Sequence, residues 1–144
     1  MRAILILTAL LVMLSGCGGD SPESAYDRFI AANNNNDGDG LIDVIWFARW
    51  DDLSTEAVAK QREQLRPFAP ALLLPVAIVE NEVIDRQETG EDEVSLTVRQ
   101  VLEDEYGNRH SSRQAFTLVL RDDSWYVLLP EEAIALLMFN NIAE

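Results

Sequence analysis

Residues 94–98, Val-Ser-Leu-Thr-Val, carry the clearest structural signal in this chain because apolar and polar side chains alternate along them. Successive side chains of a β-strand point to opposite faces of a sheet, so this period of two predicts a strand with one buried face. The same alternation recurs at residues 116–120 and 125–129. An additional strand is expected from about Val76 to Asp85. The second half of the chain is therefore predicted to be rich in strands.

Turn-forming residues separate the predicted strands. They lie at Glu88–Asp92, Tyr106–Asn108 and Asp122–Ser124. Asp, Asn, Ser and Gly suit the tight backbone of hairpin turns. Because short turns join antiparallel neighbours, the four segments predict a four-stranded antiparallel sheet.

The first half of the chain predicts helices. Ser21 is a typical N-cap, and Pro22 suits the first helical position. Apolar residues then follow at the i, i+3, i+4 spacing of one helix face: Tyr26, Phe29 and Ile30. The asparagine run at residues 33–36 is expected to end this helix, because Asn tolerates the left-handed backbone of a helix C-terminus.

Two further helices are expected before the strands. The second is predicted to be capped by Asp39 and to carry apolar residues on two faces, Leu41, Val44, Ile45 and Ala48 on one and Ile42, Trp46 and Trp50 on the other. Ser54 is predicted to cap the third helix, which stops before Pro67. A short C-terminal helix is expected over Glu131–Phe139. Helices followed by a sheet predict an α+β domain.

The chain begins with a segment typical of a secretory signal. Arg2 precedes an apolar run over residues 3–14, which is too short to cross the roughly 30 Å hydrocarbon core of a bilayer. Small residues then lead to Cys17. The tetrapeptide Leu14-Ser15-Gly16-Cys17 resembles the lipobox of bacterial lipoproteins.

This resemblance implies that the Cys17 thiol is diacylated and that the chain is cut before Cys17, whose new amine is then acylated. Cys17 is the only cysteine, so it has no partner for a disulfide. Residues 1–16 are then the lipoprotein signal peptide, residues 17–21 a lipidated tether, and residues 22–144 a single α+β domain.

The same resemblance implies a location in the bacterial envelope. Two or more acyl chains give stable anchoring, because each buried methylene contributes about 0.8 kcal/mol. Gly18, at the position after the cysteine, resembles the sorting pattern of outer-membrane lipoproteins. We therefore expect a protein held by membrane lipid through acylated Cys17, at the outer membrane and facing the periplasm.

The charge of the chain excludes one class of partner. Its 25 acidic residues outnumber 11 basic ones, which gives a formal net charge of −14. Contacts with phosphates come from Lys and Arg, so nucleic-acid binding is excluded. The acidic residues are spread along the chain, which is typical of a solvated surface.

The order of the predicted elements is similar to the NTF2-like, or cystatin-like, cone fold. The likeness depends on the Tyr26–Ile30 helix segment, the turn at residues 37–39, the polar hairpin around Gly107 and the turn at residues 122–125. It implies N-terminal helices packed on a curved four-stranded antiparallel sheet. The chain departs from the family pattern by continuing past its last strand into residues 131–144, which could cover the sheet or plug the cone.

One loop resembles a metal site. Residues 35–43 match the first nine positions of an EF-hand calcium loop in part, with oxygen-bearing side chains at alternate positions. The twelfth position requires a bidentate carboxylate and holds Trp46, and the first holds a neutral Asn. We therefore expect no metal or other cofactor.

Catalytic patterns are sparse. His110 is the only histidine, and it lies in a polar strand segment that predicts an exposed side chain. The chain lacks a Gly-x-Ser-x-Gly motif and a glycine-rich phosphate loop. Some enzymes of the similar fold pair an Asp base with a Tyr donor inside the cone, and Asp85, Tyr26 and Tyr126 have the required side chains. Their spacing does not place them together.

Four residues are candidates for the lining of a pocket: Tyr26, Trp46, Gln100 and Trp125. Gln100 interrupts the apolar face of the strand at residues 94–102, and either a β-bulge or a pocket-lining amide would explain it. Trp125 shares a face with Val127 and Leu129, which in the similar fold points toward the helices.

The sequence therefore predicts a lipid-anchored envelope protein that acts as a non-catalytic binding or interaction module. Its partner would be another envelope protein or a small apolar ligand. The alternative is an isomerase- or hydratase-like enzyme of the similar fold. A carboxylate buried in the cone with a raised pKa would favour the enzyme.

Overall fold

The structure is a computed structural model, and it describes residues 20–133. Helices and strands follow one another in this order: α2 (Pro22–Asn34), α3 (Gly38–Val44), β1 (Ile45–Phe47), the 3₁₀ helix η1 (Ala48–Asp52), α4 (Thr55–Leu65), the 3₁₀ helix η2 (Arg66–Leu72), β2 (Ala77–Gly90), β3 (Glu93–Glu103), β4 (Arg109–Arg121) and β5 (Ser124–Leu129). The expected α+β class is confirmed. The predicted signal peptide and Cys17 lie outside the described residues.

The sheet has five strands rather than the four that the sequence predicts. Their order is β1-β5-β4-β3-β2, and β1 runs parallel to β5 while the other neighbours are antiparallel. The sheet is therefore mixed. The predicted hairpins at residues 91–92, around Gly107 and at residues 122–123 are confirmed. Asp122 and Asp123 both have positive φ, at 49° and 65°, as a tight two-residue hairpin turn requires.

The fifth strand comes from a segment that the sequence predicts to be helical. Helix α3 ends at Val44, and Ile45, Trp46 and Phe47 pair with residues 127–129 of β5. β-Branched and aromatic residues favour strands, and the outer side of β5 offers unpaired backbone groups. The predicted continuation of the second helix through Trp50 is therefore wrong.

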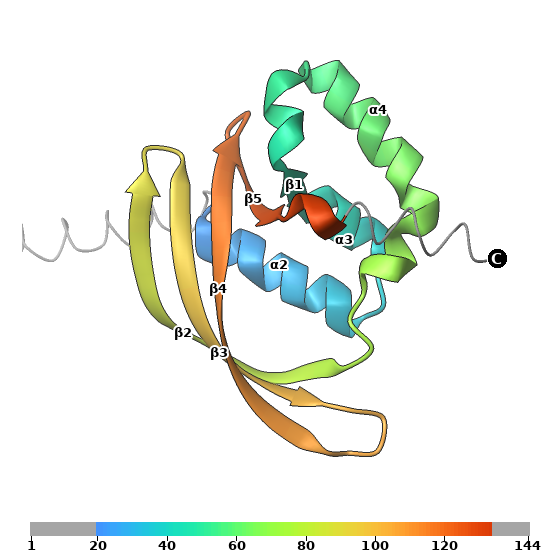
Figure 1. Cartoon of the computed structure of the whole chain (residues 1–144), viewed down its shortest axis with the longest axis vertical. Helices are drawn as coiled ribbons and strands as arrows, with labels where there is room; N and C mark the ends of the chain where they lie inside the picture. Colours follow the sequence, from blue (N-terminus) through green and yellow to red (C-terminus); the bar gives the residue numbers. More distant parts are fainter. Residues whose placement is uncertain (1–19, 134–144) are drawn as a thin grey trace, which may run out of the picture.

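Strands β2, β3 and β4 bend around helix α2, which crosses the concave face of the sheet (Figure 1). The ring centroids of Tyr26 and Phe116 lie 5.1 Å apart, and those of Phe29 and Phe116 lie 6.0 Å apart. Tyr26 is fully buried, as are Leu96 and Leu118 of the sheet. The main apolar core therefore lies between α2 and the concave face.

Helix caps follow local sequence closely. Ser21 and Ser54 accept the backbone N–H groups of Ser24 and Ala57, which confirms both predicted N-caps. The cap of α3 is Asp37 and not the predicted Asp39, because Asp37 Oδ1 accepts the N–H of Gly40 at 2.9 Å. A Cβ at Gly40 would collide with the Asp37 carboxylate, so a larger residue there would require the capping side chain to shift.

Strand β2 forms one edge of the sheet and is longer than predicted. It has register shifts against β3 at three places, between Ile78 and Glu80, between Val83 and Asp85, and between Glu88 and Gly90. Gln100 pairs with β4 in an unbroken register, so β3 has no bulge at Gln100. The bulges lie in β2 instead.

Two asparagines at the end of α2 hold the start of β2. Asn34 accepts the N–H of Ile78 and donates to its carbonyl, both at 2.9 Å. The Asn33 side chain is buried, accepts the N–H of Leu74 at 2.7 Å and donates to the Val76 carbonyl. The sequence predicted only that the asparagine run ends the helix, and this prediction is confirmed. In addition, the side chains of these asparagines tie the helix to the edge of the sheet.

The predicted C-terminal helix can be followed only at its start. Residues 131–133 are helical, and the rest of Glu131–Phe139 lies outside the described residues. Within residues 20–133, the structure has no helix with the length and apolar character needed to span a bilayer.

Candidate functional site

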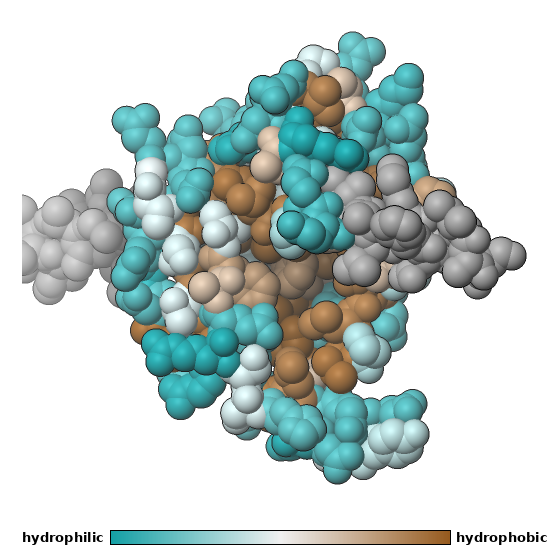
Figure 2. Space-filling model, viewed as in Figure 1, coloured by the Kyte–Doolittle hydropathy of each residue, from teal (hydrophilic) through white to brown (hydrophobic). Residues whose placement is uncertain are grey.

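An open cleft of about 770 Å³ lies between η1, the start of α4 and two turns of the sheet. One turn joins β2 to β3 and the other joins β4 to β5. Apolar side chains line it from the core side: Trp46, Trp50, Leu53, Val58 and Leu120. In the space-filling view, apolar surface is framed by hydrophilic residues between these elements (Figure 2). The cleft is the candidate functional site.

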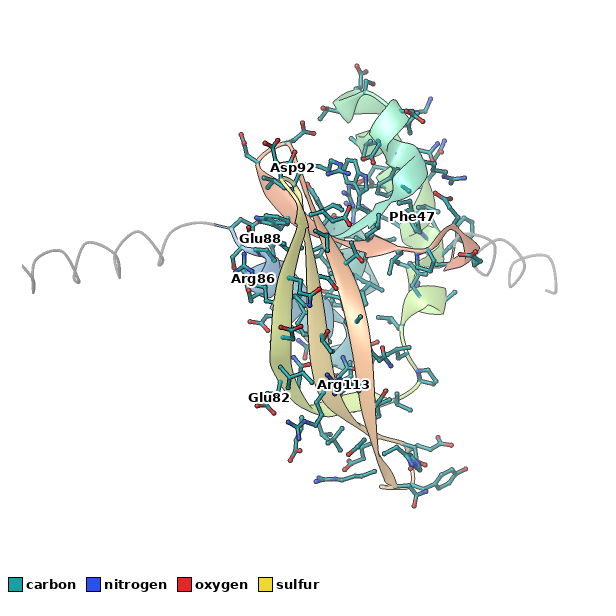
Figure 3. The ribbon with its side chains drawn as sticks, turned by 60° about the vertical axis from the view of Figure 1, so that its left-hand side comes forward. Phe47, Glu82, Arg86, Glu88, Asp92 and Arg113 are labelled. Atoms are coloured by element: carbon teal, nitrogen blue, oxygen red, sulfur yellow. The ribbon has the colours of Figure 1, made fainter. Side chains whose placement is uncertain are left out.

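Charged residues form the rim of this cleft. Five carboxylates and one guanidinium line it: Asp51, Glu91, Asp92, Glu93, Asp122 and Arg121. Figure 3 shows Asp92 at the turn end of the sheet, away from Glu82 and Arg113. A backbone hydrogen bond from Leu120 N–H to the Asp92 carbonyl, at 2.9 Å, joins the two turns. The rim is therefore held by the sheet itself.

Among the described residues that line the cleft, the one cation is Arg121, and it is paired. Arg121 donates from Nε to Asp51 Oδ1 at 2.6 Å and from Nη2 to Asp51 Oδ2 at 3.0 Å. The hydrogen bonds from Arg121 lower the pKa of the Asp51 carboxyl, and the same contact raises the pKa of Arg121. This bidentate pair ties the end of β4 to η1.

The other rim carboxylates differ from Asp51. In the part of the chain that the structure describes, no salt bridge involves Glu91, Asp92, Glu93 or Asp122. Asp122 accepts a hydrogen bond from the Thr55 hydroxyl at 3.2 Å, and Glu93 accepts one from Thr89 at 3.0 Å. These donors are neutral, and the charge of nearby Arg121, whose pKa Asp92 and Glu93 also raise, offsets the negative charge of the rim only in part.

Two tryptophans form the floor. Strand β1 sets the Trp46 side chain beside Tyr126, at 5.2 Å between ring centroids, and the Trp46 indole donates to Asp51 Oδ1 at 2.9 Å. Trp50 is fully buried and meets Trp46 and Phe47 edge-on, at 5.6 and 5.0 Å. Its Nε1 has no hydrogen-bond acceptor among the described residues. A buried indole N–H usually has one.

An arginine lies behind this floor. The Arg62 guanidinium lies 4.8 Å from the Trp50 ring, 4.9 Å from Tyr126 and 5.7 Å from Trp46. It donates to the carbonyls of Ile42 and Ile45, the latter at 2.9 Å. Burial lowers the pKa of Arg62. Arg62 therefore joins α4 to the junction of α3 and β1 and supports the aromatic floor.

The predicted pocket residues are divided between two places. Trp46 lines the cleft, whereas Tyr26 and Gln100 are buried between α2 and the concave face of the sheet. There the Tyr26 hydroxyl accepts from Gln100 Nε2 at 2.7 Å and donates to Asn81 Oδ1 at 2.6 Å. Burial raises the pKa of Tyr26 to about 12. This network is buried at Tyr26 and Gln100, reaches the exposed Asn81 and is neutral.

Trp125 occupies a third position. It lies on β5 opposite Leu120 and is half-buried against the core. Its backbone N–H donates to the Asp20 carboxylate at 2.7 Å. Trp125 therefore joins the start of the described chain to the sheet.

The three residues of the enzyme alternative are not brought together. Asp85 is exposed on β2. Tyr126 pairs with Val119, so it lies on the other face of the sheet from Phe116 and its neighbour Tyr26. His110 is exposed on β4, as predicted.

The loop that resembles an EF-hand serves as a helix start. Asp37 caps α3 and Trp46 lies in β1. Over residues 20–133, no three His, Cys, Asp or Glu side chains are grouped so that they could hold a metal ion.

Comparison with known proteins adds information on the fold. No family model matches the sequence, and no curated protein matches it. A SEC-C motif containing protein from Rhodopseudomonas palustris is similar in structure, with a TM-score of 0.52 and 16% identity over 76% of each chain. A second, from Psychrobacter arcticus, has a TM-score of 0.52 and 14% identity over 78% of this chain and 61% of its own.

Structures of NTF2-like proteins are also among those similar to this chain. One is an NTF2-like protein of unknown function from Shewanella oneidensis MR-1, with a TM-score of 0.45 and 12% identity over 74% of this chain and 91% of its own. Identities of this size show a likeness of fold alone. The helices and the curved sheet of the molecule itself place it in the α+β class.

Proposed function

We propose that this chain is a lipid-anchored protein of the bacterial envelope whose NTF2-like domain binds a ligand, without catalysis, in the cleft beside η1. The observation that carries the proposal is the composition of the cleft. Its lining, as far as residues 20–133 form it, combines an aromatic and aliphatic floor with a charged rim and contains no histidine, cysteine, serine or lysine. Such a lining offers apolar surface and charged groups for the recognition of a ligand.

The buried network around Tyr26 supports the same proposal. An isomerase- or hydratase-like enzyme would need a carboxylate base beside the tyrosine. The hydroxyl of Tyr26 is instead bonded to the amides of Asn81 and Gln100. Both amides hold the neutral hydroxyl, which stabilises the packing of α2 on the sheet.

The lipid anchor is proposed from Leu14-Ser15-Gly16-Cys17. Cells that express the wild type should incorporate labelled palmitate into this protein. Cys17→Ala should abolish the label and leave an uncut precursor, while Gly19→Ala, two residues further on, should keep both label and processing. A wild-type protein found free in the periplasm with an unmodified Cys17 would disprove the anchor.

The role of the cleft can be tested by blocking its mouth. Leu53 lines the cleft and is 39% exposed, so Leu53→Arg should fill the entrance without disturbing the core. Val79 on β2 is also 39% exposed and lies outside the lining, so Val79→Arg is a matched control. Molecules that co-purify with the wild type in mild detergent should be retained by Val79→Arg and lost by Leu53→Arg. If the same molecules co-purify with the wild type and with both variants, the cleft does not have a binding role.

A further inference from the structure

The first described residues are fastened to the rest of the domain. One oxygen of the Asp20 carboxylate accepts from the Arg28 guanidinium at 2.9 Å, and the other accepts the backbone N–H of Trp125 at 2.7 Å. Ser21 follows directly as the N-cap of α2. Because Asp20 contacts both α2 and β5, it fixes the point at which the preceding chain leaves the domain.

Little chain separates this point from the proposed lipid anchor. Three peptide units join Cys17 to Asp20. Consecutive Cα atoms lie about 3.8 Å apart, so the Cα atoms of Cys17 and Asp20 are at most about 11 Å apart in any conformation. The headgroup layer of one leaflet is roughly 5–8 Å thick. An acylated Cys17 at the lipid surface therefore brings the surroundings of Asp20 to the headgroups.

The residues near Asp20 belong to one end of the sheet. Trp125 pairs with Leu120, and the Leu120 N–H donates to the Asp92 carbonyl at 2.9 Å. Neighbouring strands are about 4.8 Å apart, so Asp92 lies within roughly 10 Å of Trp125. We call this region, which contains Asp20 and both the β2–β3 and the β4–β5 turn, the Asp20 end of the sheet.

The start of α2 and the last part of β2 also lie at the Asp20 end. Glu23 pairs with Arg86 at 2.9 Å, and Figure 3 shows Arg86 and Glu88 close to the point where the described chain begins. The β3–β4 turn, where Tyr106 is 82% exposed, projects from the opposite end of the sheet (Figure 1). Strand β4 has 13 residues and joins the two ends over roughly 40 Å of extended chain.

The charge of the Asp20 end favours one kind of lipid surface. Asp20 and Glu23 are paired with arginines. Within residues 20–133, in contrast, Glu91, Asp92 and Asp122 have no salt bridge. Carboxylates repel the phosphates of anionic headgroups, whereas zwitterionic headgroups carry no net charge. A zwitterionic surface such as phosphatidylethanolamine therefore fits this end better than phosphatidylglycerol.

We propose that the Asp20 end of the sheet rests on the zwitterionic headgroups of the membrane that holds Cys17, and that the β3–β4 turn points away from that membrane. This inference rests on the proposed lipid anchor and names the surface that the anchor brings to the lipid. Leu120 and Asp92 also line the cleft beside η1, so the proposed binding cleft lies at the same end. A ligand of the cleft is therefore met at the membrane surface.

The test measures how close each end of the sheet lies to the headgroups. The processed, full-length protein is placed in vesicles of phosphatidylethanolamine and phosphatidylcholine that contain a lipid with a nitroxide quencher on its headgroup. Glu88→Cys and Glu105→Cys each replace an exposed glutamate and add the one free thiol, because Cys17 is the only other cysteine and is acylated. The same fluorophore is attached to each. The label at position 88 should lose much of its fluorescence to the quencher, and the label at position 105 should lose little.

Two changes show what places the Asp20 end at the membrane. Inserting about ten Gly and Ser residues between Gly19 and Asp20 adds a flexible span of roughly 17 Å, so quenching at position 88 should fall toward that at position 105. Unchanged quenching would overturn the short tether as the cause. Adding phosphatidylglycerol to the vesicles should also reduce quenching at position 88, and added salt should restore it. Stronger quenching with phosphatidylglycerol would overturn the preference for zwitterionic lipid.

The outcomes separate the orientation from the anchor. Acylated Cys17 with equal quenching at positions 88 and 105 would overturn the orientation and leave the anchor standing. Unmodified Cys17 in a protein that does not bind the vesicles would overturn both. Melting temperatures confirm that the labelled variants are folded, and Thr89→Cys with Tyr106→Cys gives a second pair of exposed positions at the two ends.

Discussion

The network around Tyr26 and the cleft around Trp50 differ in whether their polar groups have hydrogen-bond or salt-bridge partners. The Tyr26 hydroxyl both donates and accepts, and its partner amides Asn81 and Gln100 carry no charge. The Trp50 indole has no acceptor in the described chain, and carboxylates without salt bridges surround the cleft that it lines. A satisfied neutral network stabilises packing, whereas carboxylates without salt bridges at an opening are accessible to a ligand.

The largest expected effect is at Arg62, which supports the floor of the cleft. Arg62→Ala removes hydrogen bonds to two buried carbonyls and the contacts with three aromatic rings. We expect the free energy of unfolding to fall by about 3–5 kcal/mol, as charged hydrogen bonds and desolvated cation–π contacts imply. Chemical denaturation of the wild type and the variant measures this difference in the free energy of unfolding. Arg99→Ala, which removes one exposed ion pair with Glu82, should change stability by less than about 1 kcal/mol and serves as the control.

The next effect is at the Tyr26 network. Tyr26→Phe keeps the ring and removes the hydroxyl, which leaves the buried Gln100 amide without its partner. The free energy of unfolding should fall by about 1–3 kcal/mol. Ligand binding in the cleft should stay as in the wild type. A loss of binding with unchanged stability would reverse the roles assigned to the two regions.

Alkaline pH gives an independent measure of the same network. The pKa of Tyr26 is raised to about 12 from an ordinary value of 10.0 by burial. The protonated hydroxyl is thus the form that the fold stabilises, so its contribution is complete below pH 10 and is lost as pH rises through about 12. Wild-type stability should decline more steeply over this range than that of Tyr26→Phe. Parallel curves would show that Tyr26 is not protected from ionisation by the fold.

A smaller effect on stability is expected at the Asp51–Arg121 ion pair of the rim. Asp51→Asn removes the charge that holds Arg121, at a site where the side chains are 42% and 28% exposed, so stability should change by less than about 1 kcal/mol at neutral pH. Because the pKa of Asp51 is lowered in the fold, this contribution is present above its ordinary pKa and is lost as pH falls. The variant and the wild type should therefore converge in stability on acidification, which thermal unfolding at several pH values can check.

The smallest effect is expected from calcium. The loop at residues 35–43 lacks a carboxylate at the clamp position, and Asp37 is used as the cap of α3. Millimolar calcium should leave the melting temperature of the protein almost unchanged. A marked rise would mean that this loop binds the ion in preference to capping the helix.

The sequence predicted the parts of the fold that local chemistry controls. The strands around residues 94–98 and 116–120, the hairpin turns and the caps at Ser21 and Ser54 depend on neighbours a few residues away. It missed β1 because Ile45 pairs with Val127, and that pairing outweighs the local helical spacing. The sequence offers Asp37 and Asp39 on either side of Gly38, and the structure shows that Asp37 is the cap whereas Asp39 lies inside α3.

The candidate site was less accessible to prediction. Trp46 was identified as a pocket residue although its predicted element was wrong. Gln100 was recognised as unusual, but its partner Tyr26 is 74 positions away. The cleft joins η1, α4 and two distant turns, and no periodic pattern links Asp51 with Arg121. The excess of acidic residues in the turns at 91–93 and 122–123 was the one available signal, and it was interpreted as a solvated surface.

The irregular edge of the sheet affects how neighbouring copies can behave. An exposed 14-residue edge strand such as β2 could template polymers of added strands, and the proposed anchor at Cys17 would increase that risk by crowding copies on one membrane. In β2, three register shifts break the regular spacing of the backbone groups. The backbone N–H and carbonyl of Ile78 are both hydrogen-bonded to the Asn34 side chain and so cannot pair with another strand. Acidic side chains along the strand repel their equivalents on another copy. The same edge that bends around α2 therefore disfavours strand addition between copies of the protein.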